Sequence, residues 1–212
     1  MRRMMLIVAM LALALGVAAP VAGARVIPAQ QLLYGERYDG WLVNWGTAAV
    51  HRSLQAKTSL LAVRGNKCGL DTGKVWFLPA SINGLLDVHC EIPRGHHVAV
   101  FVGGAANWAK KPDALRSWVN RVFETMVSYR LTVDGRSLPA PVVRTPVFVT
   151  EIPQANWLEL PPGSYDFYVK SRMVILSPLR PGEHTISTVA NYADPVEDTT
   201  YTYGFTYHLT VR

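Results

Sequence analysis

The sequence predicts a mainly β protein, a two-layer β-sandwich with two short covering helices. Three observations favour this class. Several segments alternate apolar and polar residues, which is the period of a half-buried strand. Proline and glycine interrupt the chain at short intervals, as they do between short strands. Only two segments have the three- and four-residue spacing of a helix. A jelly-roll-like topology is compatible with this pattern, because alternation does not specify which strands are neighbours.

The composition is that of a folded domain. Hydrophobic residues make up 50% of the 212 positions and charged residues 17%, whereas a disordered chain is poor in apolar residues and rich in charge. The two cysteines cannot replace a core, which excludes a small disulfide-stapled scaffold. The basic residues are scattered and form no stripe, so a nucleic acid is not expected as a partner.

The clearest strand covers residues 200–211, where every second residue is large and apolar. A second covers residues 127–133 and leads into the turn Asp134-Gly135. In both, the alternation places the apolar side chains on one face. The segments 88–92 and 98–102 are expected to pair as a hairpin. Further strands are expected at 173–176 and 184–189, on either side of a Pro-Gly turn, and at 74–78 and 142–150.

Both predicted helices carry aromatic residues on their apolar faces. The first begins at Tyr34, and its stripe runs through Tyr38, Trp41 and Trp45 to Ala49. The second begins at Pro112, a residue favoured at the first position of a helix, and ends near Met126. Its apolar face consists of Leu115, Trp118, Val119 and Val122.

The first 24 residues are expected to be a secretory signal peptide. Arg2 and Arg3 precede an apolar run, and the small residues Ala22 and Ala24 are typical of a cleavage site. The alternative is an uncleaved anchor helix, since about 20 apolar residues span a bilayer. Cleavage after Ala24 leaves a single domain, residues 25–212, that is secreted or periplasmic and has no further transmembrane segment. Removing two of the 21 basic residues leaves 19 against 15 acidic ones, a net charge of +4 instead of +6.

Export makes a disulfide bond between Cys68 and Cys90 the expected state of the two cysteines, because the compartment is oxidising. Closing a loop of this length stabilises a fold by about 3 kcal/mol in the chain-entropy model. The alternative, two free thiols of which one is catalytic, lacks a Cys-x-x-Cys spacing to support it.

Several short segments of different sequence together form a recognisable set of motifs. The Tyr- and Trp-rich helix 34–45 is followed by Cys90-Glu91-Ile92-Pro93-Arg94-Gly95 and, as the longest match, by Leu176–Ile186, which contains Pro-Leu-Arg-Pro-Gly-Glu-His-Thr-Ile. Shorter matching segments are 67–68, 73–78, 132–135 and 206–211. This set resembles a family of exported, signal-peptide-bearing bacterial and archaeal proteins of unknown function. The resemblance spans residues 34–211 and implies one exported domain, without implying an activity.

A candidate metal site lies on the expected 88–102 hairpin. His89 and Glu91 alternate with Cys90 and therefore share one face, and the following turn returns His96 or His97 across from them. Two imidazoles and a carboxylate, His89, Glu91 and His97, are suitable ligands for a divalent metal. The simpler interpretation is a solvated strand face that holds no cofactor.

The sequence assigns no catalytic residue. It contains no Gly-x-Ser-x-Gly nucleophile motif, no phosphate-binding glycine loop and no zinc-type cysteine cluster. The aromatic residues indicate binding instead, because exposed rings stack on sugars and peptides. Trp108 and Trp157 each follow an asparagine in a loop-like context and are the candidate ligand-binding residues, whereas Trp41, Trp45, Trp76 and Trp118 are expected in the core.

The expected function is therefore that of an exported, disulfide-bonded module, more a binding or envelope-associated protein than an enzyme. Its partner is expected to be a carbohydrate, a peptide or a component of the cell envelope. The alternative is an exported metal-dependent enzyme that uses the His/Glu site of the 88–102 hairpin.

Overall fold

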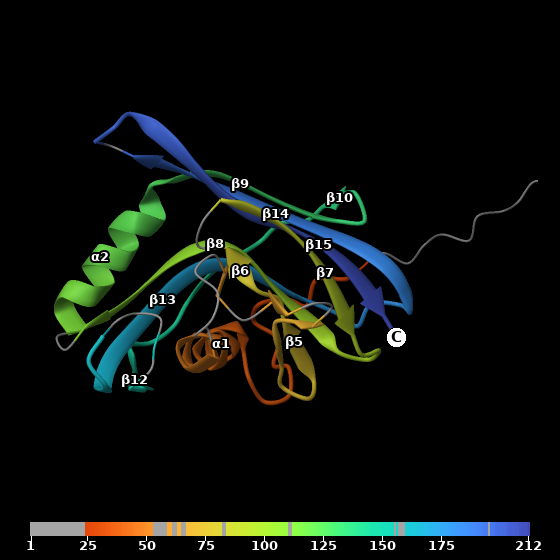
Figure 1. Cartoon of the computed structure of the whole chain (residues 1–212), viewed down its shortest axis with the longest axis horizontal. Coiled ribbons are helices and arrows are strands. Elements are labelled where there is room, and N and C mark those ends of the chain that lie inside the picture. The colour runs from red at the N-terminus through yellow and green to blue at the C-terminus, as the bar shows by residue number, and fades with distance from the viewer. Residues whose placement is uncertain are drawn as a thin grey trace, which may run out of the picture.

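The structure is a computed structural model that describes residues 24–52, 59–60, 63–64, 67–81, 84–109, 112–154, 156, 160–194 and 196–212. Two mixed sheets pack face to face, which confirms the two-layer β-sandwich (Figure 1). One sheet has the order β10 (Arg136–Ser137), β9 (Met126–Val133), β14 (Gly182–Asp194), β15 (Thr199–Val211) and β7 (Leu85–Ile92). The other has the order β11 (Val142–Arg144), β13 (Gly163–Leu176), β8 (His97–Ala109), β5 (Val75–Phe77) and β4 (Leu70–Asp71), with β12 (Phe148–Ile152) also paired to β13. We call them the β14–β15 sheet and the β8–β13 sheet.

The remaining elements cover the β8–β13 sheet or link the layers. Helix α1 (Tyr38–Arg52) lies against the face of this sheet that points away from the β14–β15 sheet, and α2 (Pro112–Glu124) lies at the end of the sandwich (Figure 1). Two short pairs, β1 (Ser59–Leu60) with β6 (Ala80–Ser81) and β2 (Val63–Arg64) with β3 (Lys67–Cys68), precede β7. None of the helices in the described part of the chain has the length and apolar character needed to cross a membrane.

The alternation in the last strand fills the space between the sheets. Phe205, Tyr207 and Leu209 of β15 are at most 2% exposed and belong to the inter-sheet core. Tyr207 is fully buried, and its hydroxyl donates a 2.6 Å hydrogen bond to the carbonyl oxygen of Pro79. This partner removes most of the cost of burying a polar group, so an aromatic residue with one hydroxyl is tolerated at the centre of the sandwich.

The aromatic stripe of α1 packs as predicted. Tyr38, Trp41, Trp45 and Ala49 are buried against the outer face of the β8–β13 sheet. The helix begins four residues later than the spacing suggests, because Tyr34 has φ +55° and lies in a turn, a backbone conformation that a helix does not accept.

A β-bulge changes the direction of the side chains along β8. Phe101 pairs with Met173 and Gly103 with Arg172, so Val102 is an extra residue on β8. An extra residue exchanges the two faces of a strand. Odd-numbered residues of β8 face α1 before the bulge, and even-numbered ones after it.

The 88–102 hairpin prediction is wrong. The strands are present as β7 and β8, but β7 pairs with β15 and β8 with β13 and β5. The chain passes from one layer to the other at the turn around Gly95, which has φ +84°. The segments 173–176 and 184–189 are likewise parts of β13 and β14 in different sheets.

Two smaller corrections concern a proline and a tryptophan. The segment 142–150 is two strands, β11 and β12, with Pro146 between them, since proline interrupts the hydrogen bonding of a strand. Trp118 of α2 is 41% exposed and is not a core residue. The face of α2 that packs on the sheets consists of Leu115, Val119 and Phe123.

The Cys68–Cys90 disulfide is confirmed: the two cysteines are bonded, their Cα atoms are 5.4 Å apart, and both are nearly inaccessible. It joins β3 to β7 and so ties the segment of short strands to the β14–β15 sheet. The predicted signal peptide lies outside the described residues, apart from Ala24.

Candidate functional site: a cavity at the open edge of β8

The candidate site lies along one edge of β8. This strand is paired with β13 over nearly its whole length, but β5 pairs with it only over His97–Ala99. Beyond Ala99, no strand in the described part of the chain covers this edge. A cavity of about 500 Å³ lies there.

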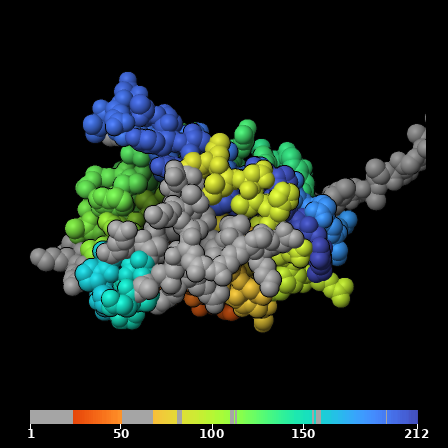
Figure 2. All heavy atoms as spheres, viewed as in Figure 1, coloured from red at the N-terminus to blue at the C-terminus, as the bar shows by residue number. Residues whose placement is uncertain are grey.

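The cavity draws its walls from α1, α2 and both sheets. Its lining residues are mostly aromatic or small: Trp45, Ala49, Val50, Ala80, Phe101, Val102, Gly103, Gly104, Ala105, Ala106, Trp108, Val122, Thr125, Phe167, Val169, Ser171, Thr188, Tyr192, Ala193, Asp194, Tyr201, Tyr203 and Gly204. Figure 2 shows the β14–β15 tip, in blue, projecting beyond the body of the molecule near α2, in green. Three of the lining residues, Ala193, Asp194 and Tyr201, come from this tip.

Aromatic pairs fix the walls in place. Trp45 of α1 packs on Phe101 with ring centroids 4.2 Å apart. Trp108 stacks on Phe167 of β13 at 6.1 Å, at an angle of 23° between the ring planes. Packing of this kind adds about 0.5–1.5 kcal/mol per pair beyond the area it buries. The rings are therefore held by the fold and form a preformed apolar surface.

Glycine at position 103 makes room for the hydroxyl group of Tyr192, another lining residue. A Cβ atom there would lie 2.8 Å from Tyr192 Oη and 2.6 Å from Ala190 Cβ, closer than such atoms approach. The Tyr192 hydroxyl passes over this position and donates a 3.1 Å hydrogen bond to the carbonyl oxygen of Gly104. Burial raises the pKa of Tyr192 to about 12, so the hydroxyl is a permanent donor. The small residues of β8 thus let the other sheet reach the cavity.

Most polar groups on the walls already have partners. Ser171 Oγ and Tyr192 Oη donate to main-chain oxygens of β8 at 3.0 and 3.1 Å, and Thr188 Oγ1 accepts a 3.2 Å bond from the main chain of β15. Trp45 differs: it is 4% exposed, and its Nε1 has no acceptor among the described residues. A buried donor without a partner costs about 1–3 kcal/mol, and the side chain that carries this donor is one of those that line the cavity.

Asp194 is the carboxylate of the lining. Its Oδ1 accepts bonds from the main-chain nitrogens of Val196 (2.7 Å) and Glu197 (3.1 Å). These bonds lower the pKa of Asp194. The carboxylate is therefore held ionised within the turn of the β14–β15 tip.

Of the two tryptophans predicted to bind a ligand, the structure describes one, Trp108. Trp108 lies in β8 and not in a loop, and the bulge turns it toward α1, where it is half-buried in the cavity wall. Trp157 lies outside the described residues. Trp45, which the spacing assigns to the core, is buried as expected and also lines the cavity. Sequence reasoning missed this second role, because the surroundings of β8 depend on which strands pair with it, and a local pattern does not show that.

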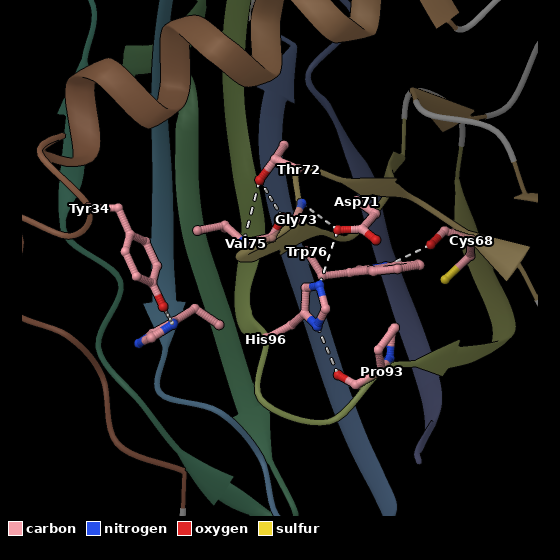
Figure 3. Close-up of polar contacts among 10 residues, drawn as sticks. Tyr34, Cys68, Asp71, Thr72, Gly73, Val75, Trp76, Pro93 and His96 are labelled. Atoms are coloured by element: carbon pink, nitrogen blue, oxygen red, sulfur yellow. Dashed lines mark hydrogen bonds and ion pairs between the residues drawn. The ribbon is translucent and has the colours of Figure 1, made fainter.

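The structure does not bring His89, Glu91 and His97 together. His97 belongs to the β8–β13 sheet, where its Nδ1 is 3.2 Å from the Tyr34 hydroxyl and burial lowers its pKa. Figure 3 shows Tyr34 and, from the turn that precedes β8, His96 between Asp71 and the carbonyl group of Pro93; both contacts of His96 are 3.1 Å long.

Trp76 completes the arrangement of Figure 3. Its Nε1 donates a 2.8 Å hydrogen bond to the carbonyl oxygen of Cys68, and its ring meets the His96 ring edge-on at 6.1 Å. His96 thus takes part in fastening the β4–β5 turn beside the disulfide. His89 lies on the outer face of the other sheet, next to Asp87 and His208, and those three form a group whose possible ligand atoms lie within 4.8 Å of one another.

Comparison with known proteins does not assign a class. No family model and no curated protein matches the chain. One solved structure with some similarity, described as PbICP-C in complex with falcipain-2, has a TM-score of 0.27 and 14% sequence identity, over 66% of this chain and 100% of that chain. A similarity of this size supports no conclusion about function.

Proposed function

We propose that the protein is an exported, non-catalytic binding module whose cavity at the open edge of β8 holds an apolar molecule that carries a carbonyl group. The observation that carries this proposal is the cavity of about 500 Å³ with its aromatic walls. One of the lining residues, Trp45, has a buried Nε1–H that finds no acceptor among the described residues.

The size and character of the cavity support a small ligand. Small-molecule sites enclose about 300–1,000 Å³ and combine apolar and aromatic walls with a few polar groups that orient the ligand. The volume of about 500 Å³ and the rings of Trp45, Phe101, Trp108 and Phe167 fit this description. A carbonyl oxygen that accepts from Trp45 Nε1 would remove the cost of the unpaired donor, which makes the site selective for ligands with an acceptor.

The polar groups argue against a sugar. A carbohydrate needs several hydrogen-bonding groups, but Ser171, Thr188 and Tyr192 already use their hydroxyls within the fold. An aromatic ketone, or an acyl chain with an ester or amide group, needs one hydrogen-bond donor and a long apolar surface. An apolar component of the cell envelope is therefore the favoured ligand among those that the sequence suggests.

Export and the absence of catalysis are parts of the same proposal. The disulfide supports an oxidising compartment, and the pattern of residues 1–24 supports cleavage after Ala24. The ionisable groups of the lining are Asp194 and three tyrosines. Asp194 is committed to its turn and Tyr192 has a raised pKa, so these two groups do not provide a general base.

The ligand proposal is tested with 6-propionyl-2-dimethylaminonaphthalene, a neutral aromatic ketone whose emission moves to shorter wavelength in an apolar site. It should bind the purified, disulfide-bonded protein at a single site. The change Trp45→Phe keeps an aromatic ring and removes the donor. It should weaken binding about fivefold, the ratio that corresponds to about 1 kcal/mol for one hydrogen bond. Ala106→Phe, which places a ring in the cavity, should abolish binding.

Two controls separate the donor from the shape of the site. Trp118→Phe changes an exposed tryptophan outside the cavity and should leave the affinity unchanged. 2-Dimethylaminonaphthalene, which lacks the ketone, should bind wild type and Trp45→Phe equally. Equal weakening of both compounds by Trp45→Phe would refute the carbonyl contact. Undiminished binding by Ala106→Phe would refute the cavity as the site.

A further inference from the structure

A second group of side chains lies on the outer face of the β14–β15 sheet. His89 of β7 is the direct register partner of His208 of β15 in a parallel pair. Their rings stack with centroids 4.7 Å apart and planes inclined by 20°. Asp87 precedes His89 by two residues, so it lies on the same face. The intervening Val88 and the following Cys90 are buried in the inter-sheet core, which fixes the face on which the three polar side chains stand.

We propose that Asp87, His89 and His208 bind a divalent transition-metal ion, with zinc as the best fit. Zinc binds imidazole nitrogen and carboxylate oxygen at about 2.0–2.2 Å, so two ligand atoms at a tetrahedral angle lie about 3.4 Å apart. Asp87 Oδ2 and His208 Nε2 are 3.1 Å apart, within about 0.3 Å of this spacing. The ligand atom of His89 lies within 4.8 Å of both, and its exposed side chain closes the remaining distance by a small rotation.

The ligand types select the metal. Magnesium and calcium prefer all-oxygen sites, whereas two imidazoles and one carboxylate suit zinc, copper or nickel. In the metal-bound form, coordination of the ion replaces the direct contact between His208 Nε2 and Asp87 Oδ2. Three protein ligands leave the fourth zinc position to water or to an external ligand. The site therefore binds the ion from the surface and leaves it accessible.

Two other carboxylates on this sheet have partners of their own, which explains why Glu91 is not a ligand. Glu91 lies two residues beyond His89 but forms a 3.0 Å ion pair with Arg212. Glu183 of β14 accepts a 2.9 Å hydrogen bond from Thr210. Both carboxylates are thus held on the same sheet without being part of the group. Of the ligands predicted from the sequence, His89 is retained, and Asp87 and His208 take the places of Glu91 and His97.

The test is calorimetric titration of the untagged, purified and disulfide-bonded protein with zinc chloride. Cobalt(II), whose visible absorption reports coordination by nitrogen and oxygen, serves as a spectroscopic substitute. Wild type should bind one zinc ion per chain. His89→Ala, His208→Ala and Asp87→Asn should each weaken zinc binding about tenfold or more, in line with the loss of a ligand.

His184 provides the matched control, because it also contacts a carboxylate, Asp134, at 2.8 Å but is not in the three-residue group. His184→Ala should leave zinc affinity and the cobalt spectrum unchanged. All three ligand side chains stand on a sheet surface, and circular dichroism of each variant should match wild type. The proposal is overturned if wild type binds no zinc at millimolar concentration, or if the ligand variants and His184→Ala bind it with the affinity of wild type.

Discussion

Single hydroxyl groups hold the layers of this fold together, and Tyr38 shows the effect most clearly. This residue is 2% exposed at the start of α1. Its hydroxyl donates to the carbonyl oxygen of Ile27 at 2.6 Å and accepts from the nitrogen of Ile175 at 2.7 Å. One atom therefore joins the N-terminal segment, α1 and β13, and burial raises the pKa of Tyr38 to about 12.

Tyr38→Phe should lower the free energy of unfolding by about 1–3 kcal/mol, because it leaves a buried main-chain donor and acceptor without their partner. Urea denaturation measures the change. Tyr129→Phe, at an exposed tyrosine, is the control and should stay within about 0.5 kcal/mol of wild type. A Tyr38→Phe variant as stable as this control would show that the hydroxyl does not link the three segments.

His184 should make stability depend on pH. Burial lowers its pKa, but hydrogen bonds to Asp134 (2.8 Å) and to the carbonyl oxygen of Arg180 (2.9 Å), with the charges of Asp134 and Glu183, raise the pKa overall. The folded state therefore binds the proton more tightly than the unfolded state. The resulting stability is complete below the unfolded pKa of about 6.5 and is lost as pH rises through the folded value. Wild type should have a higher free energy of unfolding than His184→Gln, and the difference should be larger at pH 5.5 than at pH 8.5. These two pH values lie about one unit or more below and above the unfolded pKa.

His97 should show the opposite dependence of stability on pH. Burial lowers its pKa, so its contribution to stability is present above the unfolded pKa and is lost as pH falls. The difference between wild type and His97→Gln should therefore be larger at high pH. The free energies of unfolding of wild type and of both variants are measured in urea. If the difference between wild type and each variant does not change with pH, the electrostatic account of His184 is incorrect.

At the scale of the elements, local patterns located at least part of each long strand but not the pairing between strands; of β13, only the last four residues were predicted. Strands β9 and β15 and helix α2 are where the periodicity places them, because alternation and helical spacing are properties of neighbouring residues. Helix α1 begins four residues later than predicted, and β14 is longer than the predicted segment 184–189. The pairing of β7 with β15 is set by residues more than a hundred positions apart and leaves no local signal. The second half of β8 escaped prediction, since Gly103 and Gly104 interrupt its apolar alternation.

The same distinction applies to the site residues. The cysteine pair was predictable, because two cysteines in an oxidising compartment have one possible pairing. Trp45 was predictable as a buried residue, but its place in the cavity lining depends on which strands pair with β8. His208 stood on the polar face of a well-predicted strand, yet its neighbour His89 became visible only once the parallel register was known.

The disulfide should contribute through the element it restrains. Cys68 and Cys90 are separated by 22 residues, and a crosslink over such a loop stabilises by about 3 kcal/mol by restricting the unfolded chain. The double change Cys68→Ala/Cys90→Ala should lower the free energy of unfolding by about this amount in urea denaturation. The change Cys68→Ala alone should cost the same or more, since it leaves a buried thiol. A double variant with unchanged stability would show that the packing around Leu209 and Val211 is sufficient without the bond.

At the scale of the whole molecule, the sandwich uses its two faces differently. The inner faces of both sheets form one core, and α1 gives the β8–β13 sheet a second core on its outer side. The β14–β15 sheet instead presents threonine and histidine outward along β15. The proposed apolar site therefore lies where the layers and both helices meet, and the proposed metal site lies on the uncovered face.

The position of β15 governs the order in which the molecule can assemble. This strand is inserted between β14, which immediately precedes it, and β7, which was synthesised more than a hundred residues earlier. The hairpin of β14 and β15 is a local structure and forms fast. β7 can pair with β15 only after this hairpin has formed, and until then its inner face stays uncovered. Sheets closed by such distant segments fold slowly. In a chain that crosses a membrane before folding, this sheet would thus be complete only after β15 has emerged.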